Sequence, residues 1–245
     1  MSKGSGIKKI YAQFFTQYGV SSRATSTEIV LVDNATSTPA VLGVKILNNQ
    51  YDLKSEARLI HKSQLEKGLY LRAIGKKENK TSEQHGLRKY IANLPVSKLN
   101  RQQIGALNNF VIYGTRSTTK LSWNMRFYLL KSYQSAFGRI PVSAEDWLDL
   151  LMIANGQAPS NQKTSRSAWA QGRLNALTKG FSVTDDMTRH ALMIVAYGVA
   201  SPSDQDDQLQ KQAQLKYENE FKRKPKNQDD WNQVRAIAYF LFEER

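Results

Sequence analysis

The sequence predicts an α+β protein: a small basic N-terminal domain with a short antiparallel sheet, followed by an all-α array of helix–turn–helix repeats of about 42 residues. Three observations lead to this prediction. Segment 217–238 repeats segment 133–154 without a gap, and weaker matches fall at half the spacing between them. Short segments rich in β-branched residues lie in the first hundred residues. The first hundred residues also hold 16 of the 35 Lys and Arg, against 7 of the 21 Asp and Glu.

The composition excludes several classes of protein. With 245 residues, 40% of them hydrophobic and 23% charged, the chain is long enough for one large or two small globular domains. Cysteine is absent, which excludes disulfides, thiol catalysis and zinc held by cysteine. No apolar run approaches the roughly 18 residues that a membrane span needs. The amino terminus carries no readable export signal, so we expect a location in the cytoplasm or within an assembled particle.

The basic α+β domain is expected over residues 1–85. Its sheet should be antiparallel, with three or four strands. Segment 55–67 fits either a short helix or a strand, and its composition does not decide between them. Three segments, each closed by Asn or Gly, are expected to be strands: 28–33, 41–47 and 69–74.

Helix and loop are expected elsewhere in this domain and just after it. Apolar and aromatic residues recur at helical spacing over residues 6–18. Residues 76–84 are polar and should form a loop, after which 87–94 resume a helical pattern. We therefore place the boundary between the two domains within or just after this polar loop.

The helical array is expected over residues 86–245. Its units are placed at about 86–118, 119–160, 161–202 and 203–245. The strongest internal match joins segment 133–154 to segment 217–238. The identical residues of the first segment, each repeated at the same place in the second, are Tyr133, Phe137, Arg139, Pro141, Asp146, Trp147, Ile153 and Ala154.

Each unit has the punctuation of a helical hairpin. In the unit at 119–160, Gly138 should end the first helix and Pro141 follows as a stop signal. Ser143 stands three residues before Asp146, which is typical of a capped helix start with an acidic first turn. One such hairpin cannot bury its own apolar face, so neighbouring units must share a core.

The apolar residues that recur between units predict this shared core. We expect the two tryptophans among them to be core residues rather than platforms on which bases stack. The predicted core residues are Phe137, Trp147, Ile153, Phe221, Trp231 and Ile237.

The conjunction F-G-R-x-P-x-x-x-x-D-W followed by I-A-N-G, at residues 137–156, resembles tandem helical repeats of bacterial genomes. Proteins with these repeats are often surface-associated. In them the pattern alternates with a degenerate copy that ends like Val195-Ala196-Tyr197-Gly198. The resemblance covers about residues 119–245. It implies a non-catalytic module in tandem and names no substrate; such relatives usually carry an export signal, so a surface location is implied as well.

No pattern of residues predicts a catalytic, cofactor-binding or metal-binding site. The three histidines, His61, His85 and His190, are isolated in sequence and lack the spacing of a metal site. Paired carboxylates recur at successive helix starts, which is what capping predicts, whereas an active site would need one pair. For Arg139 and Arg223, stacking on tryptophan or pairing with the adjacent acid is favoured over contact with a phosphate.

The basic N-terminal half predicts a polyanion as one partner. Lysines and arginines there are interleaved with Tyr70 and Tyr90, a combination that can follow a phosphate backbone and stack on bases. No dense basic block or known nucleic-acid motif occurs, so binding would be tolerant of sequence and sensitive to salt. The candidate nucleic-acid contacts are Lys8, Lys9, Lys76, Lys77, Lys80, Arg88 and Lys89.

Three functional hypotheses follow from the sequence. The first is a non-catalytic structural or assembly protein that presents surfaces to protein partners, including copies of itself, in a particle, filament or layer. The alternative is a sequence-tolerant nucleic-acid-binding protein that acts through the basic N-terminal domain. An enzyme without a recognisable motif is the third.

Overall fold

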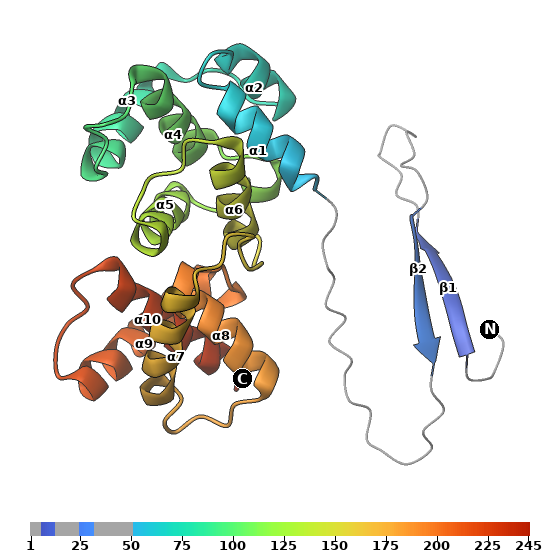
Figure 1. Cartoon of the computed structure of the whole chain (residues 1–245), viewed down its shortest axis with the longest axis vertical. Coiled ribbons are helices and arrows are strands. Elements are labelled where there is room, and N and C mark those ends of the chain that lie inside the picture. The colour runs from blue at the N-terminus through green and yellow to red at the C-terminus, as the bar shows by residue number, and fades with distance from the viewer. Residues whose placement is uncertain (1–5, 13–24, 32–50) are drawn as a thin grey trace. The chain divides into compact units, whose positions relative to one another are not determined.

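The computed structural model describes residues 6–12, 25–31 and 51–245, and it describes side chains only in the last of these ranges. The chain divides into two compact units, residues 1–47 and 48–245. In the first unit, β1 (Gly6–Ala12) pairs antiparallel with β2 (Thr25–Leu31) (Figure 1). The expectations for 13–18, for 41–47 and for further strands in this unit lie outside the described residues.

The strand β1 corrects the expectation of a helix over residues 6–18. Lys8 pairs with Ile29 and Lys9 with Glu28 across the two strands. A short apolar pattern fits both periods, and a β-branched partner strand favours the extended form. The strand expected from residue 28 is confirmed as far as Leu31.

The second unit is all-α over the described residues 51–245, with ten α-helices and no strand. Short 3₁₀ turns lie at Ile91–Asn93, Arg116–Thr118 and Pro202–Gln205. The helices are α1 (Leu53–Lys62), α2 (Lys67–Ala73), α3 (Lys80–Lys89), α4 (Arg101–Tyr113), α5 (Trp123–Phe137), α6 (Ala144–Ala154), α7 (Thr164–Leu177), α8 (Asp185–Tyr197), α9 (Asp207–Phe221) and α10 (Gln228–Glu243).

The strand expected at 69–74 is wrong, because these residues form α2 and the turn after it. Tyr70, Leu71 and Ile74 are the buried residues of the segment. Ile74 lies three residues after Leu71 and four after Tyr70, so the three side chains share one face of a helix. Because the segment is apolar almost throughout, its sequence does not reveal this helical period. Segment 55–67, for which the sequence does not decide between helix and strand, is helical through Lys62.

The polar segment before the array is also more helical than expected. Residues 76–79 are irregular, but α3 begins at Lys80, where Asn79 caps it by accepting from the Ser82 amide. Residues 53–85, which the sequence assigned to the N-terminal α+β domain, belong instead to the compact helical unit of residues 48–245.

The helix starts recur at a nearly regular interval along the chain. Helices α3, α5, α7 and α9 start at Lys80, Trp123, Thr164 and Asp207, and α4, α6, α8 and α10 follow at the same spacing. At the doubled interval, which is the offset of the two matching segments, α8 repeats the bounds of α4 and α9 repeats those of α5. The helix ends expected from the sequence are confirmed, since Gly138 is the left-handed C-cap of α5 and Ser143 the N-cap of α6.

A buried carboxylate closes the turn of the α5–α6 hairpin. Asp146 accepts hydrogen bonds from the Tyr133 hydroxyl at 2.8 Å and the Arg139 guanidinium at 2.6 Å. The backbone amides of Val142 and Ser143 donate to its other oxygen at 3.1 and 3.2 Å. Burial by itself raises the pKa of Asp146, but these donors outweigh it and the pKa lies below its usual range.

The same arrangement closes the α9–α10 hairpin. The Tyr217 hydroxyl donates to Asp230 at 2.8 Å, and Arg223 donates to both of its oxygens at 2.6 and 2.7 Å. The hydrogen bonds from Arg223 are the main reason that the pKa of Asp230 is lowered. We call each set of Tyr, Arg and Asp a turn clasp. Both arginines thus pair with the adjacent acid, the alternative that the sequence favoured.

Most of the expected core residues are buried. Phe137, Trp147 and Ile153 are at most 5% exposed, and Ile237 is 2% exposed. The Trp147 ring lies 5.5 Å from that of Phe110 on α4. Phe221 is only half-buried.

Trp231 corrects the expectation of two equally buried tryptophans, because its side chain is 36% exposed. At the equivalent place in the first half, α1 runs antiparallel along α6: its start faces Met152, and His61 near its end donates to the Val142 carbonyl at 3.0 Å. Helix α1 thus covers the hairpin that contains Trp147.

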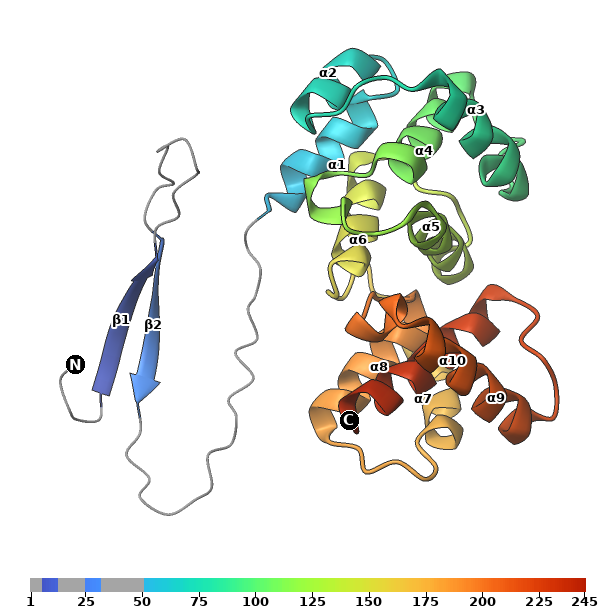
Figure 2. The same ribbon diagram turned by 180° about the vertical axis from the view of Figure 1, so that it is seen from behind.

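Helices α1–α6 and α7–α10 form two groups that meet along α5, α8 and α10 (Figures 1 and 2). A buried polar cluster joins them: the Ser132 hydroxyl on α5 donates to Asn232 on α10 at 3.1 Å, and Gln228 donates to Ser132 at 3.1 Å. Gly198, the C-cap of α8, packs directly against Ser132. The contact between the groups therefore has no room for an added side chain at this glycine.

Gly198→Ala is expected to destabilise the protein by about 2–4 kcal/mol, because an added Cβ would lie 2.3 Å from Ser132 Oγ in addition to the strain of a positive φ. Gly138→Ala is the matched control, since Gly138 has the same φ of 71° and no atom within 4 Å of an added Cβ. It should cost about 1–2 kcal/mol. Urea unfolding measures both values, and equal costs would contradict the packing described for Gly198.

Replacing both clasp carboxylates, Asp146→Asn with Asp230→Asn, should lower the free energy of unfolding at neutral pH by about 1.5–3 kcal/mol per site. Because the folded-state pKa of each Asp is lowered, its stabilisation is present above the unfolded pKa of about 3.9 and is lost as the pH falls below it. The variant should therefore lose less stability than the wild type between neutral pH and about pH 3. Urea titrations at both pH values test this, and an unchanged pH dependence would show that the clasps carry no such linkage.

Candidate functional site

A depression of about 550 Å³ lies where the segment before α3, the end of α4 and the start of α5 meet. We call it the basic groove. Lysines from two separate segments, before α3 and before α5, line its edge. The residues that line it are Lys76, Lys77, Asn79, Ser82, Ile112, Tyr113, Thr119, Lys120, Leu121, Ser122, Trp123 and Arg126.

Arg126 organises the floor of the groove. This buried guanidinium donates to the carbonyls of Val111 and Ile112 at 2.8 and 3.0 Å, and to that of Leu121 at 2.5 Å. No carboxylate among the described residues forms an ion pair with it. Burial lowers the pKa of Arg126 to about 10, so the group remains a cation at neutral pH. The floor therefore adds a positive charge that only carbonyl dipoles compensate.

The acids near the groove are already engaged. Glu83 accepts from the Tyr113 hydroxyl at 2.5 Å and from Lys67 at 2.8 Å. Glu78 also accepts from Lys67, at 2.7 Å. Burial, and then the bond to Glu83, raise the pKa of Tyr113 to about 12. The carboxylates thus leave the lysines that line the groove without an ion pair among the described residues.

Aromatic rings continue from the groove along α3 and α5. The half-buried Trp123 lies 5.9 Å from the His85 ring, and the Tyr90 ring lies 5.2 Å from that of Phe127. The Lys89 amine stands over the Tyr90 ring, 5.3 Å from its centre. Tyr90 is only 5% exposed and Tyr70 is fully buried, so neither tyrosine offers a face to a base, contrary to the expectation from the sequence. The half-buried Trp123 is the ring of this region that lines the groove beside the lysines, and cations beside an aromatic face are the combination that single-stranded nucleic acids favour.

The structure brings together some of the expected nucleic-acid contacts. Lys76 and Lys77 line the basic groove, and Lys80 is the exposed first residue of α3. Arg88 and Lys89 are exposed in the last turn of α3, beside the aromatic rings. The remaining two, Lys8 and Lys9, lie in β1 within the other unit, and their side chains lie outside the described part of the chain.

Sequence reasoning missed Lys120, Trp123 and Arg126. The repeat holds a signal for Lys120 and Trp123, because the second half has Asp204 and Asp207 at the corresponding positions, so neither residue is needed by the scaffold. Likewise, the second half has Ser160 and Asn161 at the positions that correspond to Lys76 and Lys77. The scaffold residues, by contrast, recur: Tyr113 and Tyr197 each accept a hydrogen bond from the N-cap amide, of Asn79 and Lys163, at 2.8 Å. The first half is thus basic at positions where the second half is not.

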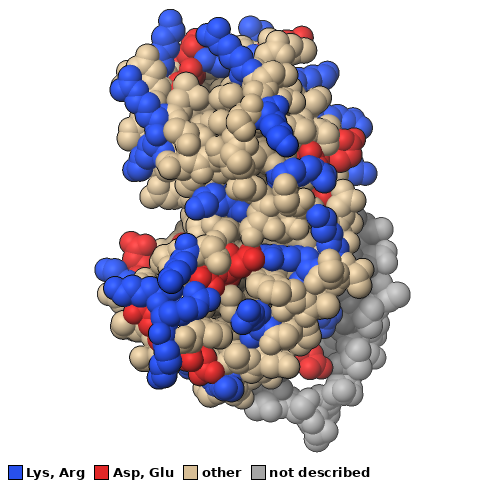
Figure 3. Space-filling view, turned by 60° about the vertical axis from the view of Figure 1, so that its left-hand side comes forward, with Lys and Arg blue, Asp and Glu red and all other residues tan. Residues whose placement is uncertain are grey.

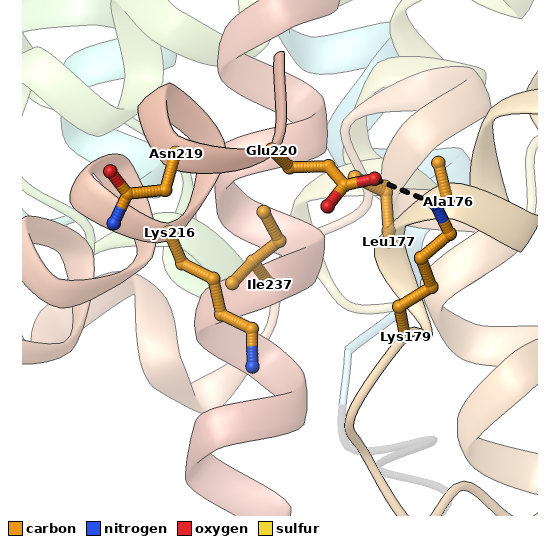
Figure 4. Close-up of a pocket in the computed structure, with 7 residues that line it drawn as sticks. All are labelled: Ala176, Leu177, Lys179, Lys216, Asn219, Glu220 and Ile237. Atoms are coloured by element: carbon orange, nitrogen blue, oxygen red, sulfur yellow. Dashed lines mark hydrogen bonds and ion pairs between the residues drawn. The ribbon is translucent and has the colours of Figure 1, made fainter. Parts of the chain in front are cut away.

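A second depression, between α7, α9 and α10, is too small to be a strong candidate. It measures about 160 Å³, whereas ligand pockets usually measure about 300–1,000 Å³. An ion pair of 2.9 Å joins two of its lining residues, Lys179 and Glu220, and Ile237 lies between Lys216 and Leu177 (Figure 4).

The described residues offer little that resembles an active site or a metal centre. Within residues 51–245 no group of three or more His, Asp or Glu side chains is placed to hold a metal ion. The carboxylate pairs lie at helix starts, and in two of the pairs the second carboxylate belongs to a turn clasp. In the same range no helix is both long and apolar enough to cross a bilayer.

Comparison with known proteins adds no relative: no family model, no curated protein and no solved structure matches this chain.

Proposed function

We propose that this protein is a non-catalytic helical scaffold that binds a polyanion, with nucleic acid as the ligand class, through the basic groove. The observation that carries the proposal is the gathering of Lys76, Lys77 and Lys120 around one depression beside Trp123, with no carboxylate paired to them among the described residues. Their amines can contact phosphates, and the indole offers a face for stacking.

The charge of the whole helical unit supports this choice. Residues 51–245 hold 30 Lys and Arg against 19 Asp and Glu, and 11 of these cations against 5 of the acids lie in residues 51–100. In Figure 3, lysine and arginine side chains spread over the upper half of the face shown, where α1–α6 lie. Such a field attracts a polyanion over a distance and makes binding dependent on salt.

The arrangement favours recognition of phosphates over recognition of base sequence. The groove offers amines and hydroxyls on loops and helix ends. None of the segments that line it forms an exposed recognition helix whose side chains could contact base edges. Binding should therefore be tolerant of sequence.

Lys76→Gln, Lys77→Gln and Lys120→Gln together should weaken binding of a labelled oligothymidine roughly tenfold or more at low salt. The slope of log K against log salt should become about 2 units shallower, because about 0.7 counterions are released per phosphate contact on a single strand. Fluorescence anisotropy over a series of salt concentrations measures both quantities.

The matched control is Lys62→Gln, Lys98→Gln and Lys211→Gln. It removes three exposed lysines outside the groove and therefore has the same net charge as the groove variant. If both triple variants lose the same affinity, the attraction is one of net charge and the groove is not the site. If the wild type does not bind at low salt, the proposed function is wrong.

The assembly function expected from the sequence is a second candidate, favoured by exposed leucines. Leu65 is 75% exposed, Leu69 52% and Leu87 40%, and Leu87 lines a further depression of about 380 Å³ at the α3–α4 contact. Exposed large apolar side chains are a feature of surfaces that contact other proteins, and Leu65 and Leu69 lie only four residues apart in the chain.

Self-association through these leucines predicts a mass above 27.8 kDa that depends on concentration, and a return to the monomer mass in Leu65→Gln with Leu69→Gln. Size-exclusion chromatography with light scattering measures the mass, and absorbance at 260 and 280 nm reports copurified nucleic acid. A monomer at every concentration, before and after substitution, would contradict self-association.

A further inference from the structure

The turn between α9 and α10 is a second basic surface, distant in sequence from the groove. Three of its residues, Lys222, Lys224 and Lys226, are exposed and have no ion pair among the described residues. In Figure 3, lysine and arginine side chains gather at the lower left, where the α9–α10 end of the second helical group comes forward, and others spread over the upper half of the same view. Cations of both helical groups are therefore present on this face.

The acids at this turn are neutralised from within. Asp230 is held by Arg223 in the turn clasp, and Asp229 forms an ion pair with Arg166. The Ser135 hydroxyl also donates to Asp229, at 2.5 Å. Each of these two carboxylates is therefore neutralised by an arginine. The three lysines remain uncompensated and make the local electrostatic potential positive.

The turn retains a strained lysine where its counterpart has a glycine. Lys222 caps α9 in the left-handed conformation, with φ at 53°, and it is the one non-glycine residue with positive φ among the described residues. Gly138 occupies the corresponding place in the first half, with φ at 71°. A left-handed residue with a side chain costs stability, and such strain tends to persist where function requires it.

The neighbouring positions differ in the same sense. Lys224 stands where the first half has the buried Ile140, and Lys226 where it has Val142, whose carbonyl α1 contacts. Trp231 is exposed where Trp147 is fully buried. The turn that α1 covers in the first half is uncovered in the second, where it carries cations and an indole.

We infer that the α9–α10 turn is a second contact for the ligand of the basic groove, and that this ligand is single-stranded nucleic acid. Lys222, Lys224 and Lys226 contact its phosphates, and the exposed face of Trp231 stacks on an unpaired base. A duplex keeps its bases stacked on one another, so it can use the lysines but not the indole. The inference rests on the proposed function of the groove and specifies the ligand.

The test compares an oligothymidine single strand with a blunt duplex of the same length, by anisotropy at low salt. Trp231→Ala should weaken the single strand by at least about fivefold and leave the duplex within twofold of the wild type. Lys222→Gly should weaken both ligands while the melting temperature stays equal or rises, because glycine relieves the positive φ. Lys211→Gln on α9 is the control for loss of one lysine, and Trp231→Phe, which retains a ring, should keep most of the single-strand affinity.

The outcomes separate the inference from the proposal on which it rests. If the groove variants lose affinity but Trp231→Ala and Lys222→Gly bind as the wild type, the inference is overturned and the groove remains the site. If Trp231→Ala weakens single strand and duplex equally, the assignment to single strands is overturned. If the wild type binds neither ligand, both the proposed function and this inference are wrong.

Discussion

The carboxylate of Asp146, repeated as Asp230, fixes the turn on which each of these hairpins depends. A tyrosine from the first helix, an arginine from the turn and the amide nitrogens before the second helix all donate to it. This clasp sets the angle at which the second helix leaves the turn, so the apolar faces of both helices point into a shared core. Packing against other helices then supplies the burial that a single hairpin lacks.

The array can be predicted from the sequence because its signals are local and repeated. The glycine C-cap of α4 recurs in α8, polar N-caps stand at Ser143 and Asn227, and aromatic residues at helical spacing recur at the same offset. The segment at 69–74 cannot be assigned in this way because its six residues are nearly all apolar, and such a run fits a strand and a helix equally well. Only packing, which buries Tyr70, Leu71 and Ile74 together, decides between them.

The exposure of Trp231 cannot be predicted from the repeat. Identical residues in two copies have the same local conformation, but their burial depends on what covers each copy. Helix α1 lies outside the repeating pattern and covers the α5–α6 hairpin alone. The groove can be predicted only in part. Lys76 and Lys77 lie in a segment that is visibly basic in the sequence, whereas Lys120 and Arg126 are distant in sequence and are brought to the groove by the fold.

The repeat separates scaffold from function within one chain. The Tyr, Arg and Asp residues of the turn clasps recur between the halves, whereas Lys76, Lys77 and Lys120 have no cationic counterpart in the second half. Hydrogen–deuterium exchange with and without a saturating single strand tests this account most directly. Amides of residues 76–82 and 113–123 should exchange more slowly in the complex, while their counterparts at 160–166 and 197–207 stay unchanged. Equal protection of both sets, or protection only of the second, would contradict the assignment of the ligand to the basic groove.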